Sequence, residues 1–368
     1  MLDLFSARHA TEDLLNAGSM ALLLGDIPRA RHVLGLALAA ARSAGGGPLI
    51  ARALEHLAYA ELRAGRHHQA RAHAEAGLAA AAAPGMRNLT ANLSAILAMV
   101  SSISGDLATV TVHARTALDI AHPHGLTQAR TLAEWAQARA DPGHGHPEHA
   151  AARLSLLVRS GPRRGHFGLW VLAVPCHIEA TVLAEHDGCV DDLIDLYAVW
   201  AAMGADPQAP AVLRRCRALV ARHDRSEALY REALDLHETV DGPFEHARTL
   251  LAYGMWLRRR RRPVEARTQL RNAAVGFERC GAAVWAERAR DELRAAGETT
   301  GDTPQTGLIE LLTPQQLRIA RKVAQGATNR EVARELAIST RTVEYHLRNA
   351  FTQLGVRSRV DLARLLND

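Results

Sequence analysis

The sequence predicts an all-α protein that consists of a long array of helical hairpins, a short linker and a small four-helix domain. Three observations predict this arrangement. Hydrophobic residues make up 48% of the chain and aromatic residues only 4%, and the apolar residues are mainly Ala and Leu, which favour helices. Small and apolar residues recur with a fixed period over residues 1–297. Residues 308–368 carry several closely spaced helix start signals.

The N-terminal part of the chain contains seven sequence units in one register. The equivalent positions are Ala30, Ala70, Val110, Ala150, Val190, Ser226 and Ala266. Successive positions are 40 residues apart, except for a spacing of 36 residues between Val190 and Ser226. The residues four, seven and eight positions later are mostly small or apolar and form one face of a helix. Glycines that predict the end of a preceding helix lie five residues before the first four positions: Gly25, Gly65, Gly105 and Gly145. Each unit is therefore predicted to be a helical hairpin.

Small residues also occur twelve positions before the aligned residue, at Gly18, Ala58, Ala98, Ala138 and Gly254. They would let the two helices of a hairpin approach closely. This pattern resembles the tetratricopeptide repeat, although the units are longer than its usual period and Ile178 and Arg214 replace the small residue in two of them. The alternative is an unrelated Ala-rich bundle. A stacked array exposes a concave face formed by the first helices, which predicts a binding function for a peptide, a protein or a small effector.

The boundary of the array is marked by a change in composition. A helix over residues 282–296 is expected to cover the last hairpin. Residues 298–307 then contain almost no apolar side chains and several helix breakers. We interpret them as a flexible linker between the array, residues 1–297, and a C-terminal domain, residues 308–368.

The C-terminal domain carries four helix start signals. A capping box at 313–316 opens a helix to Gln325, and a second at 328–331 opens a short helix to about Ala337. Ser339 caps a third helix that ends before Gly355, and Ser358 opens a fourth. Short helices joined by a tight turn describe a helix-turn-helix domain with one extra helix on each side.

The third helix has two distinct faces. An apolar stripe is expected to pack on the first two helices of the domain: Val343, Leu347, Ala350, Phe351 and Leu354. The opposite face carries Arg341, Glu344, Tyr345, Arg348 and Thr352. Residues 308–368 contain ten Lys/Arg and six Asp/Glu, a net charge of +4, whereas the whole chain carries +5. This charge suits a polyanion, so the polar face is predicted to enter the major groove of double-stranded DNA.

The same residues identify a family. The domain resembles the LuxR-type DNA-binding domain over its whole length, through Leu312-Thr-Pro, Gly326, Asn329-Arg-Glu-Val-Ala333, Leu336, Ile338-Ser339, Thr342-Val343, His346 and Leu354-Gly-Val-Arg-Ser-Arg359. Gln316, where the family usually has Glu, and Leu317, where it is usually charged, depart from the pattern. Gln still completes a capping box, so the fold is expected to persist.

The resemblance implies roles for individual residues. It implies contacts to base edges from Glu344, Tyr345 and Arg348. It implies contacts to the DNA backbone from Thr328, Asn329, Arg341 and Thr342. It also implies a homodimer on DNA through the fourth helix, with Val360, Ala363 and Leu366 at the interface.

The whole layout is similar to the C-terminal half of the large ATP-binding LuxR-type (MalT-related) regulators. Residues 244–254, 277–281 and 285–293 carry this likeness. Either the chain is a shortened member or it is a fragment without the ATPase half. Lys322 is the only lysine and lies in the C-terminal domain, so no phosphate-binding loop of the Walker type can be formed.

These features predict a transcription regulator and not an enzyme, with no cofactor. The alternative is an interaction scaffold whose helix-turn-helix tail is degenerate or only dimerises. The chain lacks an apolar run that could span a bilayer and a signal peptide at its start, which predicts a cytoplasmic protein without membrane contact.

The cysteines, a histidine group and an arginine run are not assigned a catalytic or metal-binding role. The four cysteines lie far apart and are expected to be reduced and mostly buried. His144, His146 and His149 are expected in a solvated loop rather than a metal site. The five arginines 258–262 are placed at the turn of the last hairpin, either solvated or near DNA phosphates or an acidic partner.

Overall fold

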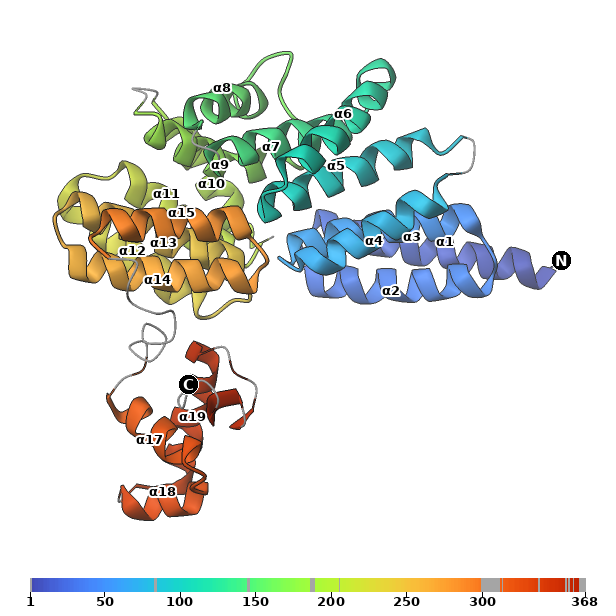
Figure 1. Cartoon of the computed structure of the whole chain (residues 1–368). Helices are drawn as coiled ribbons and strands as arrows, with labels where there is room; N and C mark the ends of the chain where they lie inside the picture. The colour runs from blue at the N-terminus through green and yellow to red at the C-terminus, as the bar shows by residue number, and fades with distance from the viewer. Residues whose placement is uncertain are drawn as a thin grey trace. The chain divides into compact units, whose positions relative to one another are not determined.

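The computed structural model describes residues 2–82, 85–143, 146–185, 189–204, 206–298, 312, 314–336, 338–354, 356, 358–359 and 361–363. All regular structure in these residues is helical (Figure 1). The chain divides into two compact units, residues 1–292 and 293–368. No helix among the described residues is long and apolar enough to cross a membrane.

The first unit is an array of helical hairpins, as predicted. The described residues form α1 (Leu2–Leu23) with α2 (Ile27–Ser43), α3 (Gly47–Arg63) with α4 (His67–Ala80), α5 (Arg87–Ser104) with α6 (Leu107–His124), α7 (Thr127–Gly143) with α8 (Pro147–Val158), α9 (Trp170–Leu183) with α10 (Asp191–Ala202), α11 (Ala209–Val220) with α12 (His223–His237), and α13 (Pro243–Arg259) with α14 (Pro263–Arg279). The helix α15 (Ala283–Ala295) follows, close to the predicted range.

The sequence register coincides with the packing of these hairpins. All seven aligned residues are buried, from Ala30 at 0% exposure to Val190 at 5%. The second helix of a hairpin lies against the small residue of the first: a Cβ added at Gly18 would stand 2.5 Å from the Leu34 side chain. Gly65 ends a helix with a φ of 72°, a left-handed conformation that glycine adopts without steric cost. The predicted glycine at 145 lies outside the described residues.

The two hairpins in which Ile178 and Arg214 replace the small residue form as well. Ile178 is completely buried in α9, where the larger side chain fills space between helices. Arg214 turns to the surface and forms an ion pair with Glu232 at 2.8 Å. Larger residues at these positions therefore change the local packing and do not interrupt the array.

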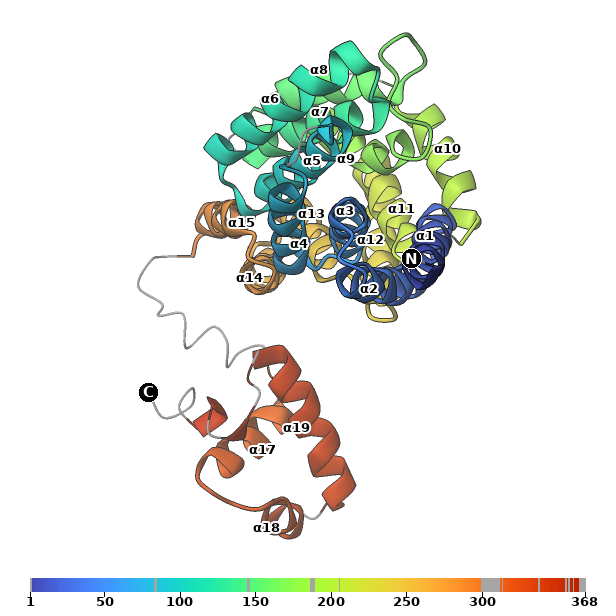
Figure 2. The ribbon, with the colours of Figure 1, turned by 90° about the vertical axis from the view of Figure 1, so that its right-hand side faces the viewer.

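The first helices of successive hairpins pack on one another and form the inner layer of the array. The contacts run from α1 to α3, α5, α7, α9, α11 and α13. In the end-on view the hairpins wind around a common axis (Figure 2). This winding brings distant segments together: Arg63 forms an ion pair with Asp206 at 3.4 Å, and the ring of His67 lies 5.4 Å from that of Phe244.

The second unit contains α17 (Pro314–Ala324), α18 (Asn329–Glu335) and α19 (Thr340–Leu354) among its described residues. The predicted helices are thus present, and the first two end slightly earlier than expected. Residues 359 and 361–363 are also helical.

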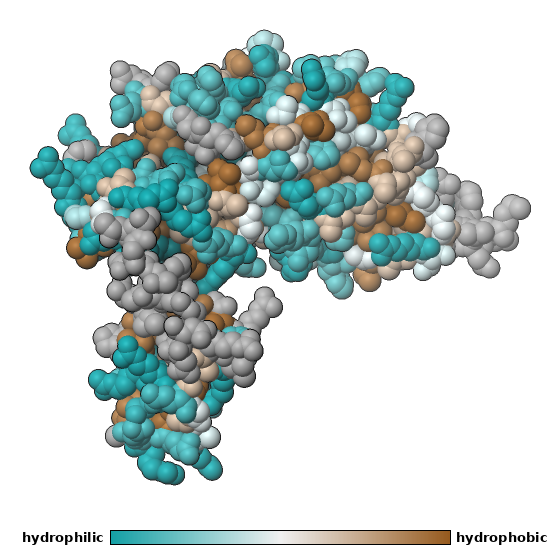
Figure 3. Space-filling view, viewed as in Figure 1, coloured by the Kyte–Doolittle hydropathy of each residue, from teal (hydrophilic) through white to brown (hydrophobic). Residues whose placement is uncertain are grey.

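Hydrophilic side chains dominate the surface that the last hairpins of the array present in Figure 3.

Candidate nucleic-acid interface

The start of α18 is held by a reciprocal capping box. The backbone N–H of Glu331 donates to the hydroxyl of Thr328 at 3.3 Å, and the N–H of Thr328 donates to the Glu331 carboxylate at 2.7 Å. The Thr328 hydroxyl also donates to that carboxylate at 2.8 Å. These bonds hold the pKa of Glu331 below its usual value. Two N–H groups at the helix start are satisfied internally, and the others remain available to an anion.

Asn329, the other residue predicted here to contact the DNA backbone, is half-buried and has a partner. Its side-chain oxygen accepts a hydrogen bond from the Arg359 guanidinium, which also donates to the Ala327 carbonyl at 3.2 Å. Arg359 therefore ties the start of the fourth helix to the start of α18. No separate role was predicted for Arg359, because residues 30 positions apart carry no local signal of contact.

The turn before α19 orients the predicted recognition helix. Ser339 accepts a hydrogen bond from the N–H of Thr342 at 3.0 Å, and their hydroxyls lie 2.7 Å apart. The N–H of Ile338 donates to the Ala333 carbonyl at 3.0 Å, which closes the end of α18. Ser339 is thus the predicted helix cap, and Thr342 is half-buried beside it.

The buried face of α19 joins the core of the domain. Val343 and Ala350 are completely buried, Leu347 and Leu354 nearly so, and Phe351 is half-buried. They pack with side chains of the preceding helices, Ile319, Val323, Val332 and Leu336. Each of these contacts was predicted from the spacing of apolar residues. The core fixes the direction in which the opposite face of α19 points.

That opposite face is exposed and chemically suited to base edges. Arg341, Glu344, Tyr345 and Arg348 are all exposed, and 61% of Tyr345 is accessible. Within the described part of the chain, the guanidiniums of Arg341 and Arg348 make no hydrogen bond or ion pair. An unpaired guanidinium can donate two hydrogen bonds to a guanine edge, and a carboxylate can accept one from a cytosine amino group. The side chains that the sequence predicted as base readers thus lie together on one helix face.

The only lysine of the domain does not lie free on this surface. Lys322 forms an ion pair with Glu335, which links α17 to the end of α18. Of the predicted dimer residues, Ala363 is half-buried, while Val360 and Leu366 lie outside the described residues. The fourth-helix interface therefore stays a prediction.

The array also carries four cysteines and one histidine cluster. The four cysteines are free thiols, and all but Cys189 are buried, as predicted. His146, Glu148 and His149 are exposed at the start of α8, and their candidate ligand atoms lie within 4.8 Å of one another. The two imidazole rings stack at 5.2 Å. His144 lies outside the described residues, and these exposed groups show no feature that requires an ion.

Comparison with known proteins assigns the C-terminal domain. Residues 310–366 match the model of the family described as bacterial regulatory proteins, luxR family. Transcriptional regulatory protein UhpA of Escherichia coli (strain K12) is 40% identical over 63 residues, which are 17% of this chain and 32% of UhpA. Nitrate/nitrite response regulator protein NarP of the same strain is 38% identical over 80 residues, 22% of this chain and 36% of NarP.

Longer relatives match in the same way. The putative HTH-type transcriptional regulator Rv0890c of Mycobacterium tuberculosis (strain ATCC 25618 / H37Rv) is 33% identical over 81 residues, 22% of this chain and 8% of that protein. The chain thus spans at most 36% of the length of these three relatives. A crystal structure of Rap protein complexed with competence and sporulation factor covers 78% of this chain and 98% of its own, at 12% identity and a TM-score of 0.45. Residues 310–366 are a helix-turn-helix domain of the luxR family of bacterial regulatory proteins.

Proposed function

We propose that this protein is a sequence-specific DNA-binding transcription regulator in which α19 reads the major groove and the hairpin array binds an effector. One observation carries the first half of the proposal. The exposed face of α19 presents Arg341 and Arg348 without internal hydrogen bonds or ion pairs, and Tyr345 beside them, on a helix that the domain core and the Ser339 cap hold in place. A helix-turn-helix domain inserts this helix into the major groove.

The position of each side chain along α19 supports its proposed role. Arg348 stands in the middle of the helix, two turns beyond Arg341, so it is placed to reach a guanine edge. Arg341 stands in the first turn and is placed to contact a phosphate, together with the helix start at Thr328 and Asn329. Glu344 and Tyr345 lie beside Arg348 and complete the base-reading surface.

The second half of the proposal concerns regulation and assembly. The inner layer of first helices forms a surface of the kind that repeat arrays use to bind a peptide, a protein or a small molecule. A homodimer through Val360, Ala363 and Leu366 would place two copies of α19 on an inverted repeat with half-sites about one helical turn apart. Binding at the array would then alter the activity of the DNA-bound dimer.

The experiment compares Arg348→Ala and Arg341→Ala on a selected operator and on random DNA over a series of salt concentrations. Arg348→Ala is expected to cost about 1 to 3 kcal/mol on the operator and much less on random DNA. Arg341→Ala is expected to weaken binding to both and to lower the salt slope by about one unit. Both variants should unfold like the parent, because neither side chain belongs to the apolar stripe.

Arg225→Ala is the matched control, because it removes the same charge from an exposed position in the array. It should leave operator affinity unchanged. Equal losses for Arg348→Ala on operator and random DNA would show that Arg348 does not read bases. If no genomic fragment is bound above random DNA, the protein is an interaction scaffold and the proposed function is wrong.

A further inference from the structure

A cavity of about 120 Å³ lies inside the hairpin array, in the inner layer of first helices. Residues from α3, α5, α7, α9, α11 and α13 line it. Three arginines, Arg63, Arg139 and Arg248, contribute to its wall, together with the rings of Trp135 and Phe244. Several hairpins must therefore stack in the correct superhelical twist before this cavity exists.

The arginines of the cavity differ in how their charge is balanced. Arg248 donates to the carboxylates of Glu245 at 2.9 Å and Glu179, and Arg63 pairs with Asp206. Arg139 forms no ion pair with any described residue. Its guanidinium donates to Cys176 Sγ at 3.9 Å and lies over the rings of Trp135 at 4.9 Å and Phe244 at 5.7 Å.

The surrounding charges leave an excess of cations. Both oxygens of Glu245 are already occupied, one by Arg248 and one by Arg215 at 2.6 Å. Four guanidiniums, those of Arg139, Arg215, Arg248 and Arg288, act on the two carboxylates of Glu179 and Glu245. Burial acts to raise the pKa of Glu245, but the neighbouring guanidiniums of Arg248 and Arg215 hold that pKa below its usual value. Burial, aided by Arg139, lowers the pKa of His67 in the cavity wall to about 4, so His67 is neutral near pH 7.

Two buried donors of the cavity have no acceptor. The Nε–H groups of Arg139 and Arg248 are inaccessible to solvent and make no hydrogen bond in the described structure. Arg248 is only 3% exposed as a whole. A buried charged donor without an acceptor is unfavourable, and a bound anion would remove that cost.

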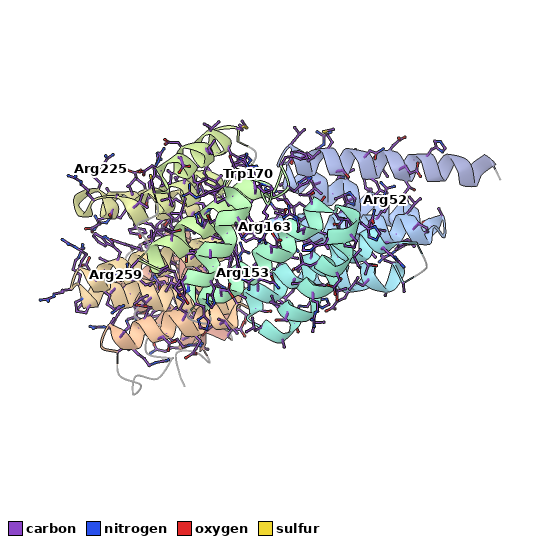
Figure 4. The ribbon with its side chains drawn as sticks, turned by 90° about the horizontal axis from the view of Figure 1, so that it is seen from above. Arg52, Arg153, Arg163, Trp170, Arg225 and Arg259 are labelled. Atoms are coloured by element: carbon purple, nitrogen blue, oxygen red, sulfur yellow. The ribbon has the colours of Figure 1, made fainter. Side chains whose placement is uncertain are left out.

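A wider pocket of about 590 Å³ shares Tyr59 and Arg63 with the cavity. Its wall combines polar side chains, such as Glu55 and His56, with the apolar side chains of Leu23, Trp200 and Phe167, and Phe167 is 75% exposed. Phe167 belongs to the segment between α8 and α9, which also carries Arg163 and ends at Trp170 (Figure 4). The N–H of His166 donates to the Thr131 hydroxyl at 2.8 Å and holds this segment against α7. The cavity offers an anion site, and the wider pocket offers contacts to apolar side chains.

We propose that the array binds a small organic monocarboxylate with an apolar body, its carboxylate near Arg139 and Arg248 and its body toward Phe167 and Trp200. The negative charge of a carboxylate suits this excess of cations. A multiply charged phosphate fits poorly, because the carboxylates of Asp206 and Glu245 also line the cavity. This inference rests on the proposed function, because it takes the bound carboxylate to be the effector of the regulator.

The test measures binding to the full chain by calorimetry and by the change in Tm, with 4-phenylbutyrate, phenylacetate and benzoate as probes. 4-Phenylbutyramide is the uncharged analogue, and inorganic phosphate tests for a general anion site. At least one acid is expected to bind with a Kd below 1 mM, at least tenfold more tightly than the corresponding amide or phosphate. Absence of binding by all three acids, or equal affinity of acid and amide, would overturn the inference.

Arg139→Gln keeps an N–H donor at about the position of Nε and removes one positive charge. It is expected to weaken binding of the acid at least tenfold and to leave the Tm of the free protein unchanged or higher, since Arg139 has no ion pair to lose. Arg225→Gln is the control at an exposed position and should bind the acid like the parent. Unchanged affinity in Arg139→Gln would assign the acid to another place and refute the site.

DNA binding separates this inference from the proposed function. The unliganded Arg139→Gln variant is expected to bind the operator like the parent, and only its response to the acid is lost. If the parent binds DNA specifically but no acid, the effector assignment fails and the proposed function stands. If the acid binds but no DNA sequence is selected, the cavity assignment stands as a binding site and the proposed function fails.

Discussion

Gly254→Ala tests the close approach of the two helices in the last hairpin. Gly254 lies in α13 and faces Leu270 of α14, a completely buried residue. A Cβ at Gly254 would stand 2.7 Å from both Cγ and Cδ2 of Leu270 and 3.4 Å from the Ala266 carbonyl oxygen. Carbon atoms do not approach to 2.7 Å without strain. Because Leu270 is enclosed on all sides, its side chain cannot rotate away freely.

Two opposing effects decide how far Gly254→Ala changes the free energy of unfolding. Replacing Gly by Ala inside a helix gains about 1 kcal/mol from helix propensity. Overpacking of a buried contact costs about 1 to 3 kcal/mol. We therefore expect Gly254→Ala to lower the free energy of unfolding by about 1 kcal/mol. Gly35→Ala is the matched control, because Gly35 is exposed in α2 and an added Cβ meets nothing within 4 Å. It should raise the free energy of unfolding by about 0.5 to 1 kcal/mol.

A double-mutant cycle with Leu270→Ala isolates the contact. Leu270→Ala alone is expected to cost about 2 to 5 kcal/mol, because it leaves a cavity. In that background the added methyl at 254 no longer meets a side chain, so Gly254→Ala should become stabilising by about 1 kcal/mol. Urea unfolding followed by far-UV circular dichroism measures all four proteins. A Gly254→Ala variant as stable as Gly35→Ala, with additive effects in the cycle, would refute the close packing of α13 on α14.

Two further predictions concern pH and the arginine run. Burial lowers the pKa of His177 to about 4 and of His237 to about 3, below the unfolded value of 6.5. The unfolded chain therefore binds more protons below pH 6.5, so the free energy of unfolding is highest above pH 6.5 and falls toward pH 4, by about 1.4 kcal/mol per pH unit for each histidine. His177→Asn should flatten this slope by one proton in urea titrations between pH 7 and 4, and an unchanged slope would contradict the assignment. In the arginine run, Arg258 forms an ion pair with Glu292 at 2.8 Å, and Arg262 forms one with Glu227 at 2.7 Å. The other three arginines, Arg259, Arg260 and Arg261, are exposed, and Figure 4 shows Arg259 at the end of the array. Replacing these three with Ser should leave the salt slope of DNA binding unchanged, since a solvated run releases no counterions from DNA; a lower slope would show that the run contacts phosphates.

Much of the fold was accessible to sequence reasoning because its signals are local. Helical periodicity, glycines in left-handed turns and small residues such as Gly18 identified the hairpins, and the caps Thr328 and Ser339 identified the helices of the luxR-family domain. The faces of α19 followed from the same periodicity. Ile178 and Arg214 looked like interruptions, but the packing of neighbouring helices accommodates one inside the core and the other on the surface.

The sequence by itself determined the helices, their pairing into hairpins and the exposed polar face of α19, because each depends on residues within a few helical turns. Tertiary structure alone decided which distant groups meet. Small rotations between successive hairpins accumulate along the array, and their sum brings Arg63 to Asp206 and Arg248 to Glu179. The same winding leaves Arg139 without an ion pair in the wall of a cavity. No local pattern encodes that imbalance, because burial and charge compensation depend on the position of every hairpin around the axis.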